Sequence, residues 1–243
     1  GWMADLKMAA YKIASADLTN WPLIDAAAAQ GVPLMISTGA STLDELHAVV
    51  DHCCDLGNDQ IILLHCILSY PAPVEQINLR RIPLLIAQFP EAVIGLSSHV
   101  TPDPCVTVPL TAVALGAKVV EVHFTLDTGM AGVDHTLSVD PALLRSLVNS
   151  IRIVEAALRD EEVTVLPCEE PARMYARRSI VAATDLPAGT AIAREHLIMK
   201  RPGTGVPPME MERMLGRRTL RAIAEDQLVT WEDVELHGPT SPR

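Results

Sequence analysis

Five short runs rich in β-branched and aliphatic residues recur in the first 124 residues, and each is followed by a stretch with helical character. The runs are YKIAS (11–15), VPLMIST (32–38), QIILLHC (60–66), AVIGLSS (92–98) and KVVEVHF (118–124). They begin 21, 28, 32 and 26 residues apart, which is the scale of one strand followed by one helix. Repeated units of this kind place their strands parallel, so the pattern predicts a doubly wound sheet or a (β/α) barrel.

The stretches between the runs carry the signals of amphipathic helices. One begins at Ser41 or Thr42, a helix-capping residue followed by acids, and ends at Gly57. Segments 78–90 and 104–117 indicate two further helices. The strongest helical pattern, 141–160, places five apolar side chains on one side: Leu143, Leu147, Ile151, Val154 and Leu158.

Composition narrows the class of protein. Apolar residues make up 49% of the chain with only two Phe, so the core must consist mainly of aliphatic side chains. A net charge of −11 argues against a nucleic-acid partner, because phosphate backbones are bound by basic surfaces. It does not exclude a small anionic substrate that is held by a few local cations.

Cysteine usage and hydropathy predict the compartment. The five cysteines form neither a CxxC pair nor an even framework, which indicates reduced thiols. No apolar run approaches the ~20 residues of a membrane helix, and the N-terminal GWMADLKMAA lacks the plan of a signal peptide. We therefore expect a soluble, cytoplasmic protein with no membrane partner.

The composition changes after residue 160. Segment 161–174 is acidic, contains two prolines and has little periodicity, so we interpret it as a linker. Residues 1–160 then form the first domain, and residues 175–237 form a compact module of short strands and turns.

All five predicted strands finish on polar residues, at the end of a parallel sheet where ligands bind. On the last strand, alternation turns Val119, Glu121 and His123 to one side. The two polar groups cost several kcal/mol to bury unless they are hydrogen-bonded or ligated. A polar side near the carboxyl end of a strand therefore predicts a site.

Each polar strand end also has a structural interpretation. A lone histidine there, such as His65, is more often a hydrogen-bonded structural residue than a ligand. His99 and His123 end consecutive strands at matching depth, so their imidazoles could converge on one divalent metal that acts as a Lewis acid on a carbonyl. Lys12 with its neighbouring serines could hold a phosphate or carboxylate, or could be a lysine that extends its amine to solvent beside turn-forming serines.

The blocks that carry these residues closely resemble the sialic acid synthase family, which includes the N-acetylneuraminate, legionaminate and pseudaminate synthases. The matching blocks are KIASADLTNWPLI (12–24), LMISTGASTLDEL (34–46), LLHCILSYPAPVEQINL (63–79), IGLSSHV (94–100), VALGAKVVEVHFTLD (113–127), VDHTLSVDP (133–141), RRSIVAATDLPAGT (177–190) and KRPGTG (200–205). The blocks run in the family's order and cover nearly the whole chain. The last two resemble the family's SAF (antifreeze-like) domain.

The resemblance implies a fold and a reaction. The fold is the last five βα units of a partial (β/α)8 TIM barrel, followed by the small β-rich SAF domain. The reaction is a condensation of phosphoenolpyruvate with an N-acyl hexosamine, such as N-acetylmannosamine, which gives a nonulosonic (sialic-type) acid and phosphate. Carbon 3 of phosphoenolpyruvate attacks the open-chain sugar aldehyde, water adds at carbon 2, and phosphate leaves.

The resemblance also implies roles for individual residues. His99 and His123 match the ligands of a divalent metal, typically Mn²⁺ with Mg²⁺ or Co²⁺ as alternatives, and Asp17 matches an acid near the reacting carbons. Glu121 is implied as a second catalytic acid, which faces the substrate or supports a ligand; the structural alternative is a buried acid paired with Lys12 or another interior base. The positions that match phosphoenolpyruvate contacts are Lys12, Ser15, Ser37 and Ser97.

The sugar is contacted by positions that match Tyr70, Asp134 and Arg201. The position that matches Arg201 lies in the family's SAF domain. The resemblance implies that this domain caps the partner's barrel mouth in a domain-swapped homodimer, where the arginine reaches the sugar's N-acyl group.

The family's barrel has eight strands, and the match begins near the fourth. We therefore expect the chain by itself to be inactive or poorly folded. Two other functions remain open: a non-catalytic sugar-binding or assembly role, and a synthase for a different aldose.

Overall fold

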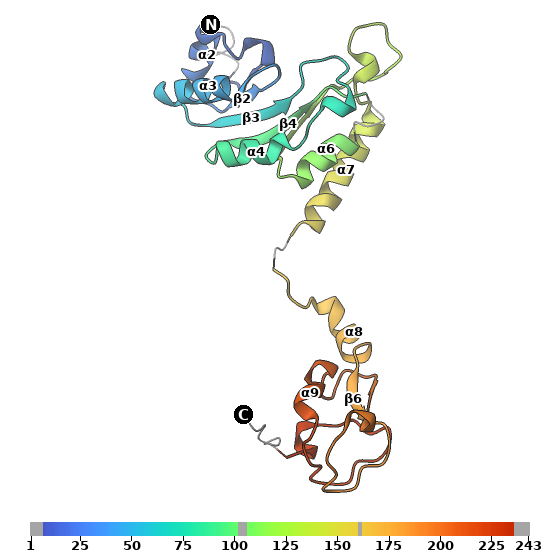
Figure 1. Cartoon of the computed structure of the whole chain (residues 1–243). Helices are drawn as coiled ribbons and strands as arrows, with labels where there is room; N and C mark the ends of the chain where they lie inside the picture. The colour runs from blue at the N-terminus through green and yellow to red at the C-terminus, as the bar shows by residue number, and fades with distance from the viewer. Residues whose placement is uncertain (1–6, 102–105, 160–161, 236–243) are drawn as a thin grey trace. The chain divides into compact units, whose positions relative to one another are not determined.

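The computed structural model describes residues 7–101, 106–159 and 162–235 (Figure 1). The chain divides into two compact units, Gly1–Glu161 and Glu162–Arg243, here called unit 1 and unit 2. Residues 1–6, 160–161 and 236–237 of the predicted domains lie outside the described residues, as does Cys105. In the part that the structure describes, no helix is long and apolar enough to cross a membrane.

Unit 1 is built on a five-stranded parallel sheet in the order β1-β2-β3-β4-β5. The strands are β1 (Tyr11–Ile13), β2 (Leu34–Ser37), β3 (Ile61–Cys66), β4 (Val93–Ser98) and β5 (Val119–Val122). Each of the five predicted runs contains one of these strands, so the parallel βα prediction is confirmed. The first strand ends two residues earlier than predicted, because Ser15–Asp17 turns into a 3-10 helix.

The sheet curves like part of a barrel. Five strands in a flat sheet would place β1 and β5 roughly 19 Å apart. A lysine and a glutamate side chain together reach only about 11 Å, yet Lys12 of β1 and Glu121 of β5 form an ion pair. The sheet must therefore bend until its first and last strands face each other, as strands four apart do in an eight-stranded barrel. This confirms the predicted partial TIM barrel.

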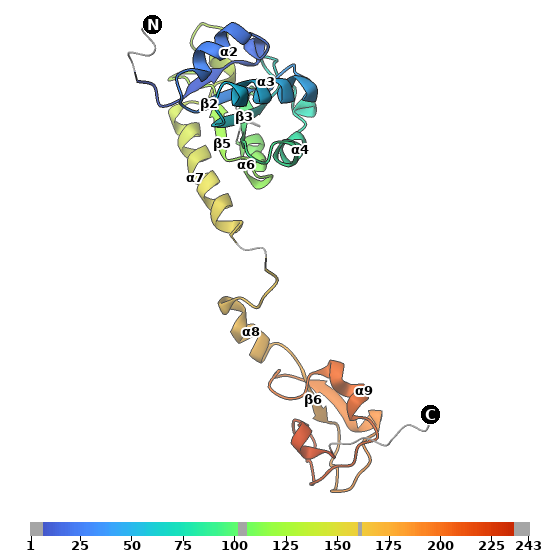
Figure 2. The same ribbon diagram turned by 90° about the vertical axis from the view of Figure 1, so that its left-hand side faces the viewer.

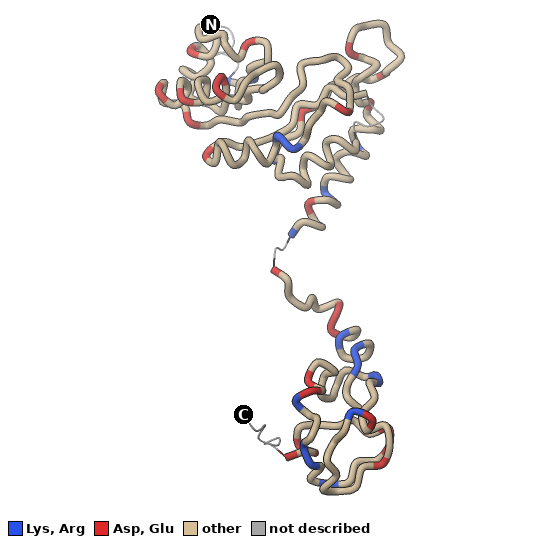
Figure 3. Tube along the Cα trace, in the orientation of Figure 1, with Lys and Arg blue, Asp and Glu red and all other residues tan. Residues whose placement is uncertain are grey.

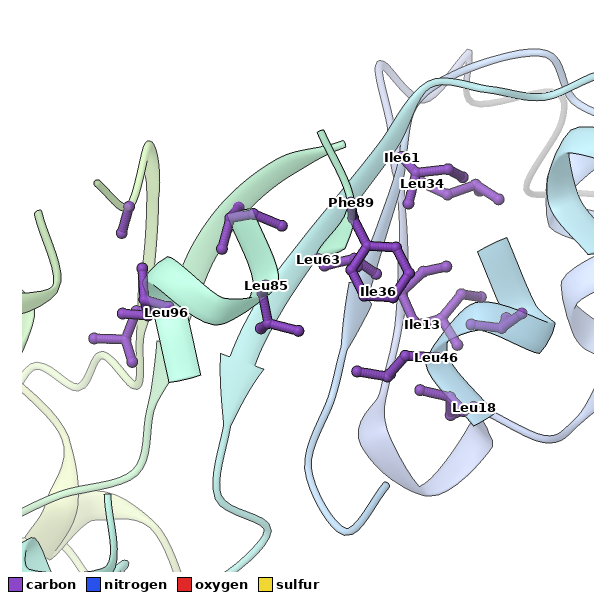
Figure 4. Close-up of a cluster of buried hydrophobic side chains, with 14 of the residues drawn as sticks. Ile13, Leu18, Leu34, Ile36, Leu46, Ile61, Leu63, Leu85, Phe89 and Leu96 are labelled. Atoms are coloured by element: carbon purple, nitrogen blue, oxygen red, sulfur yellow. The ribbon is translucent and has the colours of Figure 1, made fainter. Parts of the chain in front are cut away.

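The outer face of this sheet carries the main core, under helices α2 (Trp21–Ala28), α3 (Leu43–Asp55), α4 (Arg81–Gln88) and α6 (Thr107–Ala114) (Figures 1 and 2). Because side chains alternate along a strand, every second residue points outward. Ile13, Ile36, Leu63 and Leu96 are fully or almost fully buried in this way. Figure 4 shows them packed with Leu46 and Leu85 from the covering helices.

Helix α3 begins where the sequence indicates. The side chain of Thr42 accepts a hydrogen bond from the backbone of Glu45, and the Glu45 carboxylate accepts one from the backbone of Thr42. This reciprocal capping box satisfies two backbone N–H groups that the first helical turn leaves free, and a cap of this kind contributes about 1 kcal/mol.

Helix α7 (Pro141–Ala157) confirms the strongest helical pattern in the sequence. Its buried residue is Leu147, while Leu143, Ile151 and Val154 are half-buried and Leu158 is exposed. The predicted apolar side is correct for the first four positions. The fifth, Leu158, follows the last helical residue, Ala157, and is exposed.

Unit 2 has a core of its own, separate from that of unit 1. It contains an antiparallel pair, β6 (Ser179–Ala182) with β7 (Leu197–Lys200), and the short helix α9 (Met211–Met214). Ile180, Ile192 and Met214 are among its fully buried side chains. Helix α8 (Glu170–Tyr175) begins inside segment 161–174, which the sequence predicts as a linker, and ends one residue after it.

Candidate functional site

A row of polar side chains crosses the inner face of the sheet near the carboxyl ends of the strands. The strand register pairs Cys66 with Ser97 and Ser97 with Glu121, and register partners on parallel strands point to the same face. Ser97 Oγ donates a 2.6 Å hydrogen bond to Glu121 Oε1. Lys12 Nζ lies 3.4 Å from the other carboxylate oxygen, Oε2. Glu121 is thus paired with Lys12, as one of its two interpretations requires. Its side chain is half-exposed, so the other interpretation, an acid that faces the substrate, also remains open.

Cys66 is a member of this row that sequence reasoning missed. The sequence indicates a core thiol, yet its Sγ lies on the inner face of the sheet, 3.8 Å from His99 Nδ1. Burial raises the pKa of the thiol, although hydrogen bonds with Ser15 and Ser97 and the charge of Lys12 oppose that rise. The thiol therefore stays protonated at neutral pH. Its position at the end of a predicted strand was the available signal.

The neighbouring His65 points the opposite way. Its side chain is buried on the outer face, and Nε2 lies 2.7 Å from the carbonyl oxygen of Ile77. Desolvation lowers the pKa of this imidazole, and the charge of Arg81 adds to the effect, against the hydrogen bond to Ile77. The structural interpretation of His65 agrees with this geometry.

The structure brings His99 and His123 together. Each follows the end of its strand, β4 and β5, and their ring centroids are 5.2 Å apart with an interplanar angle of 81°. His99 Nδ1 lies 2.9 Å from the carbonyl oxygen of Ile67, which can only accept a hydrogen bond. The proton is therefore on Nδ1, and the lone pair of Nε2 is free. Burial is the main cause that lowers the pKa of His99, so the ring is neutral, as a metal ligand must be.

Tyr70 closes one side of the histidine pair. Its ring stacks on His99 with centroids 4.1 Å apart and meets His123 edge-on at 5.7 Å. The peptide bond between Tyr70 and Pro71 is cis. The predicted sugar-contacting tyrosine thus lies directly beside both predicted ligands.

Asp134 approaches the same place from the loop between β5 and α7, the yellow-green loop at the upper right of Figure 1. Its Oδ2 is 3.7 Å from His123 Nδ1. The contacts that hold this loop include Thr125 Oγ1, which lies 2.7 Å from His135 Nδ1, and Ser138 Oγ, which donates to the Asp134 carbonyl.

The serines predicted to contact phosphoenolpyruvate lie at the ends of the first strands. Ser15 Oγ accepts a hydrogen bond from the Gly39 backbone at 3.0 Å. Ser37 ends β2 and is 2% exposed, and its Oγ has no hydrogen-bond partner among the described residues. An unsatisfied hydroxyl in the floor of a site can bind a ligand oxygen.

Two predicted residues are not brought into this cluster by any contact in the described residues. Asp17 lies in the 3-10 helix after β1, where its Oδ1 accepts a hydrogen bond from Asn20. Arg201 belongs to unit 2, where its Nε donates to the carbonyl of Ala176. The roles predicted for both residues remain predictions.

The donor set around the histidines fits a divalent ion with open coordination positions. Within the described residues no group of three or more His, Cys, Asp or Glu side chains forms a complete metal cage. Two imidazoles bound to one ion at about 2.1 Å have ring centroids roughly 5 Å apart, which agrees with the pair His99 and His123. Remaining positions would be filled by water or substrate oxygens, as in catalytic metal sites.

The floor of the site narrows at Gly95 on β4. A methyl group at this position would lie 2.6 Å from Leu64 Cδ2 and 2.6 Å from the carbonyl oxygen of Val119. Only a glycine allows the inner side chains of the flanking strands to approach this closely.

Comparison with known proteins agrees with this arrangement. A model of the NeuB family matches residues 1–163, and a model of the SAF domain matches residues 177–235. An N,N'-diacetyllegionaminic acid synthase of Legionella pneumophila is 37% identical over 92% of this chain and 63% of its own length. The N-acetylneuraminate-9-phosphate synthase of Mus musculus is 36% identical over 98% of this chain and 65% of its own.

Solved structures give the same result. A putative spore coat polysaccharide biosynthesis protein E from Chromobacterium violaceum has a TM-score of 0.72 at 29% identity, over 94% of this chain and 68% of that one. The N-acetylneuraminic acid synthetase of Leptospira borgpetersenii, solved with citrate, has a TM-score of 0.64 at 31% identity, over 69% of this chain and 57% of that one.

The chain spans about two thirds of the length of its curated relatives. Both family models match in the order expected from the sequence, and the partial barrel is the fold of the solved relatives. The chain therefore belongs to the NeuB family, the sialic acid synthases, and contains a SAF domain.

Proposed function

We propose that this chain carries the catalytic part-barrel and the SAF domain of a nonulosonic acid synthase. The reaction joins phosphoenolpyruvate, an N-acyl hexosamine and water, and it yields the nine-carbon acid and inorganic phosphate. The observation that carries the proposal is the meeting of His99 and His123 beside Tyr70 at the carboxyl end of the sheet. The names of the relatives, legionaminic acid and N-acetylneuraminate-9-phosphate synthases, support the same class of product.

We propose Mn²⁺ as the ion that His99 and His123 hold, with Mg²⁺ or Co²⁺ as alternatives. When bound, it would supply Lewis-acid polarisation of the sugar's aldehyde oxygen. The Ile67 carbonyl fixes the tautomer and orientation of His99, in the way that supporting hydrogen bonds orient metal ligands. We assign the same supporting role toward His123 to Asp134, whose Oδ2 lies 3.7 Å from His123 Nδ1.

Phosphoenolpyruvate is an anion, and we assign it to Lys12, a cation on the inner face of the sheet. Glu121 and Ser97 hold the lysine ammonium in position through the contacts described above. The free hydroxyl of Ser37 and that of Ser15 are then available to the phosphate or carboxylate oxygens. Asp17, one turn beyond β1, is the proposed acid near the reacting carbons.

For the sugar we propose Tyr70 and Asp134 from unit 1, and Arg201 from the SAF domain of a partner in a domain-swapped homodimer. The expected compartment is the cytoplasm. Four cysteines within the described residues are free thiols, in keeping with a reducing environment.

The test uses the complete gene product with phosphoenolpyruvate, N-acetylmannosamine and Mn²⁺, and follows phosphate release and the mass of the acid product. His123→Ala should weaken Mn²⁺ binding by at least ~100-fold in calorimetry, since loss of even an outer-shell partner costs 10–100-fold. It should also abolish product formation.

His52→Ala is the matched control, because His52 is a half-exposed histidine on α3 that pairs with Asp25 on α2. It should leave Mn²⁺ binding and turnover unchanged. Mn²⁺ binding by His123→Ala at the level of the unmodified protein would contradict the proposal.

A further inference from the structure

A cavity of about 250 Å³ lies on the outer side of the unit 1 sheet, between the starts of α3 and α4. Four leucines of these two helices line it, so its wall is largely apolar. His65 of β3 and Arg81, the first residue of α4, bring polar groups to it. Sites for drug-sized ligands have volumes of roughly 300–1,000 Å³, so this cavity suits a smaller metabolite.

His65 has one ring nitrogen without a partner. Its side chain is 1% exposed, and Nε2 lies 2.7 Å from the carbonyl oxygen of Ile77. A carbonyl oxygen only accepts hydrogen bonds, so the proton is on Nε2 and Nδ1 holds a lone pair. In the described part of the chain, the fully enclosed side-chain atoms that lack a partner are the hydroxyls of Ser37 and Ser98. Nδ1 is therefore not fully enclosed, and it is accessible from the cavity that the ring lines.

Arg81 supplies a positive charge that acts on His65. Its guanidinium has neither a hydrogen bond nor an ion pair with any residue that the structure describes. The hydroxyls of Thr38 and Ser41, which also line the cavity, already donate to backbone carbonyls. Figure 3 shows the start of α4 in blue, where Arg80 and Arg81 follow each other. A guanidinium without a partner fits a carboxylate or phosphate group, which can accept two parallel hydrogen bonds from it.

The two helices add to the positive potential. Leu43 and Arg81 are the first residues of α3 and α4, and both line the cavity. The N-terminal end of a helix carries a partial positive charge. Asp44 and Glu45 in the first turn of α3 offset part of this charge, but no acid is among the lining residues.

We propose that this cavity is a second binding site, for a small hydroxy acid whose carboxylate or phosphate pairs with Arg81 and whose hydroxyl donates to His65 Nδ1. The sheet separates the cavity from the inner face, so the site suits an effector and not a substrate. Thr38 directly follows Ser37, and His65 directly precedes Cys66. The bound acid therefore contacts the sequence neighbours of two residues on the inner face.

The test titrates the complete gene product, free of divalent metal, with D-glycerate and with glycerol 3-phosphate, and measures binding by calorimetry. At least one of the two acids should bind, and the tighter one identifies the preferred anionic group. Glycerol, which lacks the charge, should bind at least about tenfold more weakly. Absence of binding by both acids would overturn the proposal. Because no turnover is measured, the result is independent of the proposed reaction.

Three charge substitutions locate the bound acid. Arg81→Gln should weaken its binding at least about tenfold, since hydrogen bonds to a charged group are lost. Arg81 is exposed, so its replacement leaves the core intact. Arg80→Gln is the matched control, because it removes the same charge one residue earlier, at a position that does not line the cavity. Arg80→Gln and Lys12→Gln should both leave binding unchanged. Binding that Lys12→Gln abolishes and Arg81→Gln retains would place the acid on the inner face and overturn the proposal.

His65→Gln tests the hydroxyl contact. The glutamine amide can still donate to the Ile77 carbonyl, but it offers no acceptor at the position of Nδ1. The unmodified protein should bind D-glycerate about three- to tenfold more tightly than propionate, which lacks the hydroxyls. His65→Gln should bind the two acids equally. A hydroxyl preference that survives in His65→Gln would overturn the assignment of His65, and if this variant does not fold, Arg81→Gln decides the proposal.

Discussion

Ser37 and Ser98 are both buried, and neither hydroxyl has a hydrogen-bond partner in the described part of the chain. They differ in direction. Ser37 shares the inner face with Lys12, whereas Ser98 follows the inward-facing Ser97 and therefore points outward. A buried hydroxyl without a partner lowers the free energy of unfolding by about 1–3 kcal/mol, so each serine destabilises the fold. For Ser37 the proposed substrate contact explains the cost, while nothing in the structure explains it for Ser98.

This contrast gives a residue-scale prediction. Ser98→Ala should raise the free energy of unfolding by about 1 kcal/mol, because it removes an unsatisfied polar group, and should leave kinetics unchanged. Ser37→Ala should also keep or raise stability, yet increase the KM for phosphoenolpyruvate about tenfold, which corresponds to one hydrogen bond to a charged group. Urea unfolding and steady-state kinetics measure the two effects. An unchanged KM in Ser37→Ala would remove Ser37 from the binding site.

At the scale of elements, strand β3 shows what alternation gives and what it leaves out. Alternation predicts that His65 and Cys66 face opposite sides, but it does not say which of them faces inward. The register with β4 decides this, because Cys66 pairs with Ser97 and so shares its inner row. A shift of one residue would have reversed both assignments.

The strands, the main helices and the meeting of His99 with His123 were predictable, because hydrophobic periodicity and strand order determine them. The contact between Lys12 and Glu121 was foreseen only as an alternative, since it depends on how far the sheet curves. The position of Asp134 depends on the loop contacts of Thr125 and Ser138, and no periodic pattern encodes these.

A pH prediction follows from the buried His65. Its pKa is lowered in the folded state, so the unfolded chain binds the proton more readily. The contribution of neutral His65 to the free energy of unfolding is therefore complete above the ordinary histidine pKa of 6.5, and it is lost as the pH falls below that value. His65→Gln cannot titrate in this range. The unmodified protein should therefore lose more unfolding free energy than His65→Gln between pH 7.5 and pH 5.0 in urea titrations, and equal losses would contradict the assignment.

At the scale of the whole molecule, the two cores are separate, and each unit has its own stabilising contacts. Unit 2 depends on Asp233, a fully buried carboxylate that accepts hydrogen bonds from the backbone and hydroxyl of Thr230 and from Arg221. Burial by itself would raise the pKa of Asp233, but these hydrogen bonds outweigh it and lower the pKa. The stabilisation is therefore present above the ordinary pKa of 3.8 and is lost as the pH falls below it.

Asp233→Asn should destabilise unit 2 by about 2–3 kcal/mol, because hydrogen bonds to a charged acceptor are lost or weakened. Hydrogen exchange read by mass spectrometry should show faster exchange in segment 177–235 and no change in segment 11–122. Asp226→Asn, which removes an exposed ion pair with Lys200, should cost less than about 1 kcal/mol. Faster exchange in both units after Asp233→Asn would show that the two cores unfold together.

Gly95 has a consequence for how substrate preference can diverge among such enzymes. A single carbon added at Gly95 would lie too close to the backbone oxygen of Val119, so this position on the inner face of the sheet does not accept a larger residue. We therefore expect new sugar specificities to arise from insertions and substitutions in the loops that follow the strands, while the inner face of the sheet at Gly95 stays unchanged. A laboratory selection for altered sugar use should recover changes in segment 123–134 and none at this glycine.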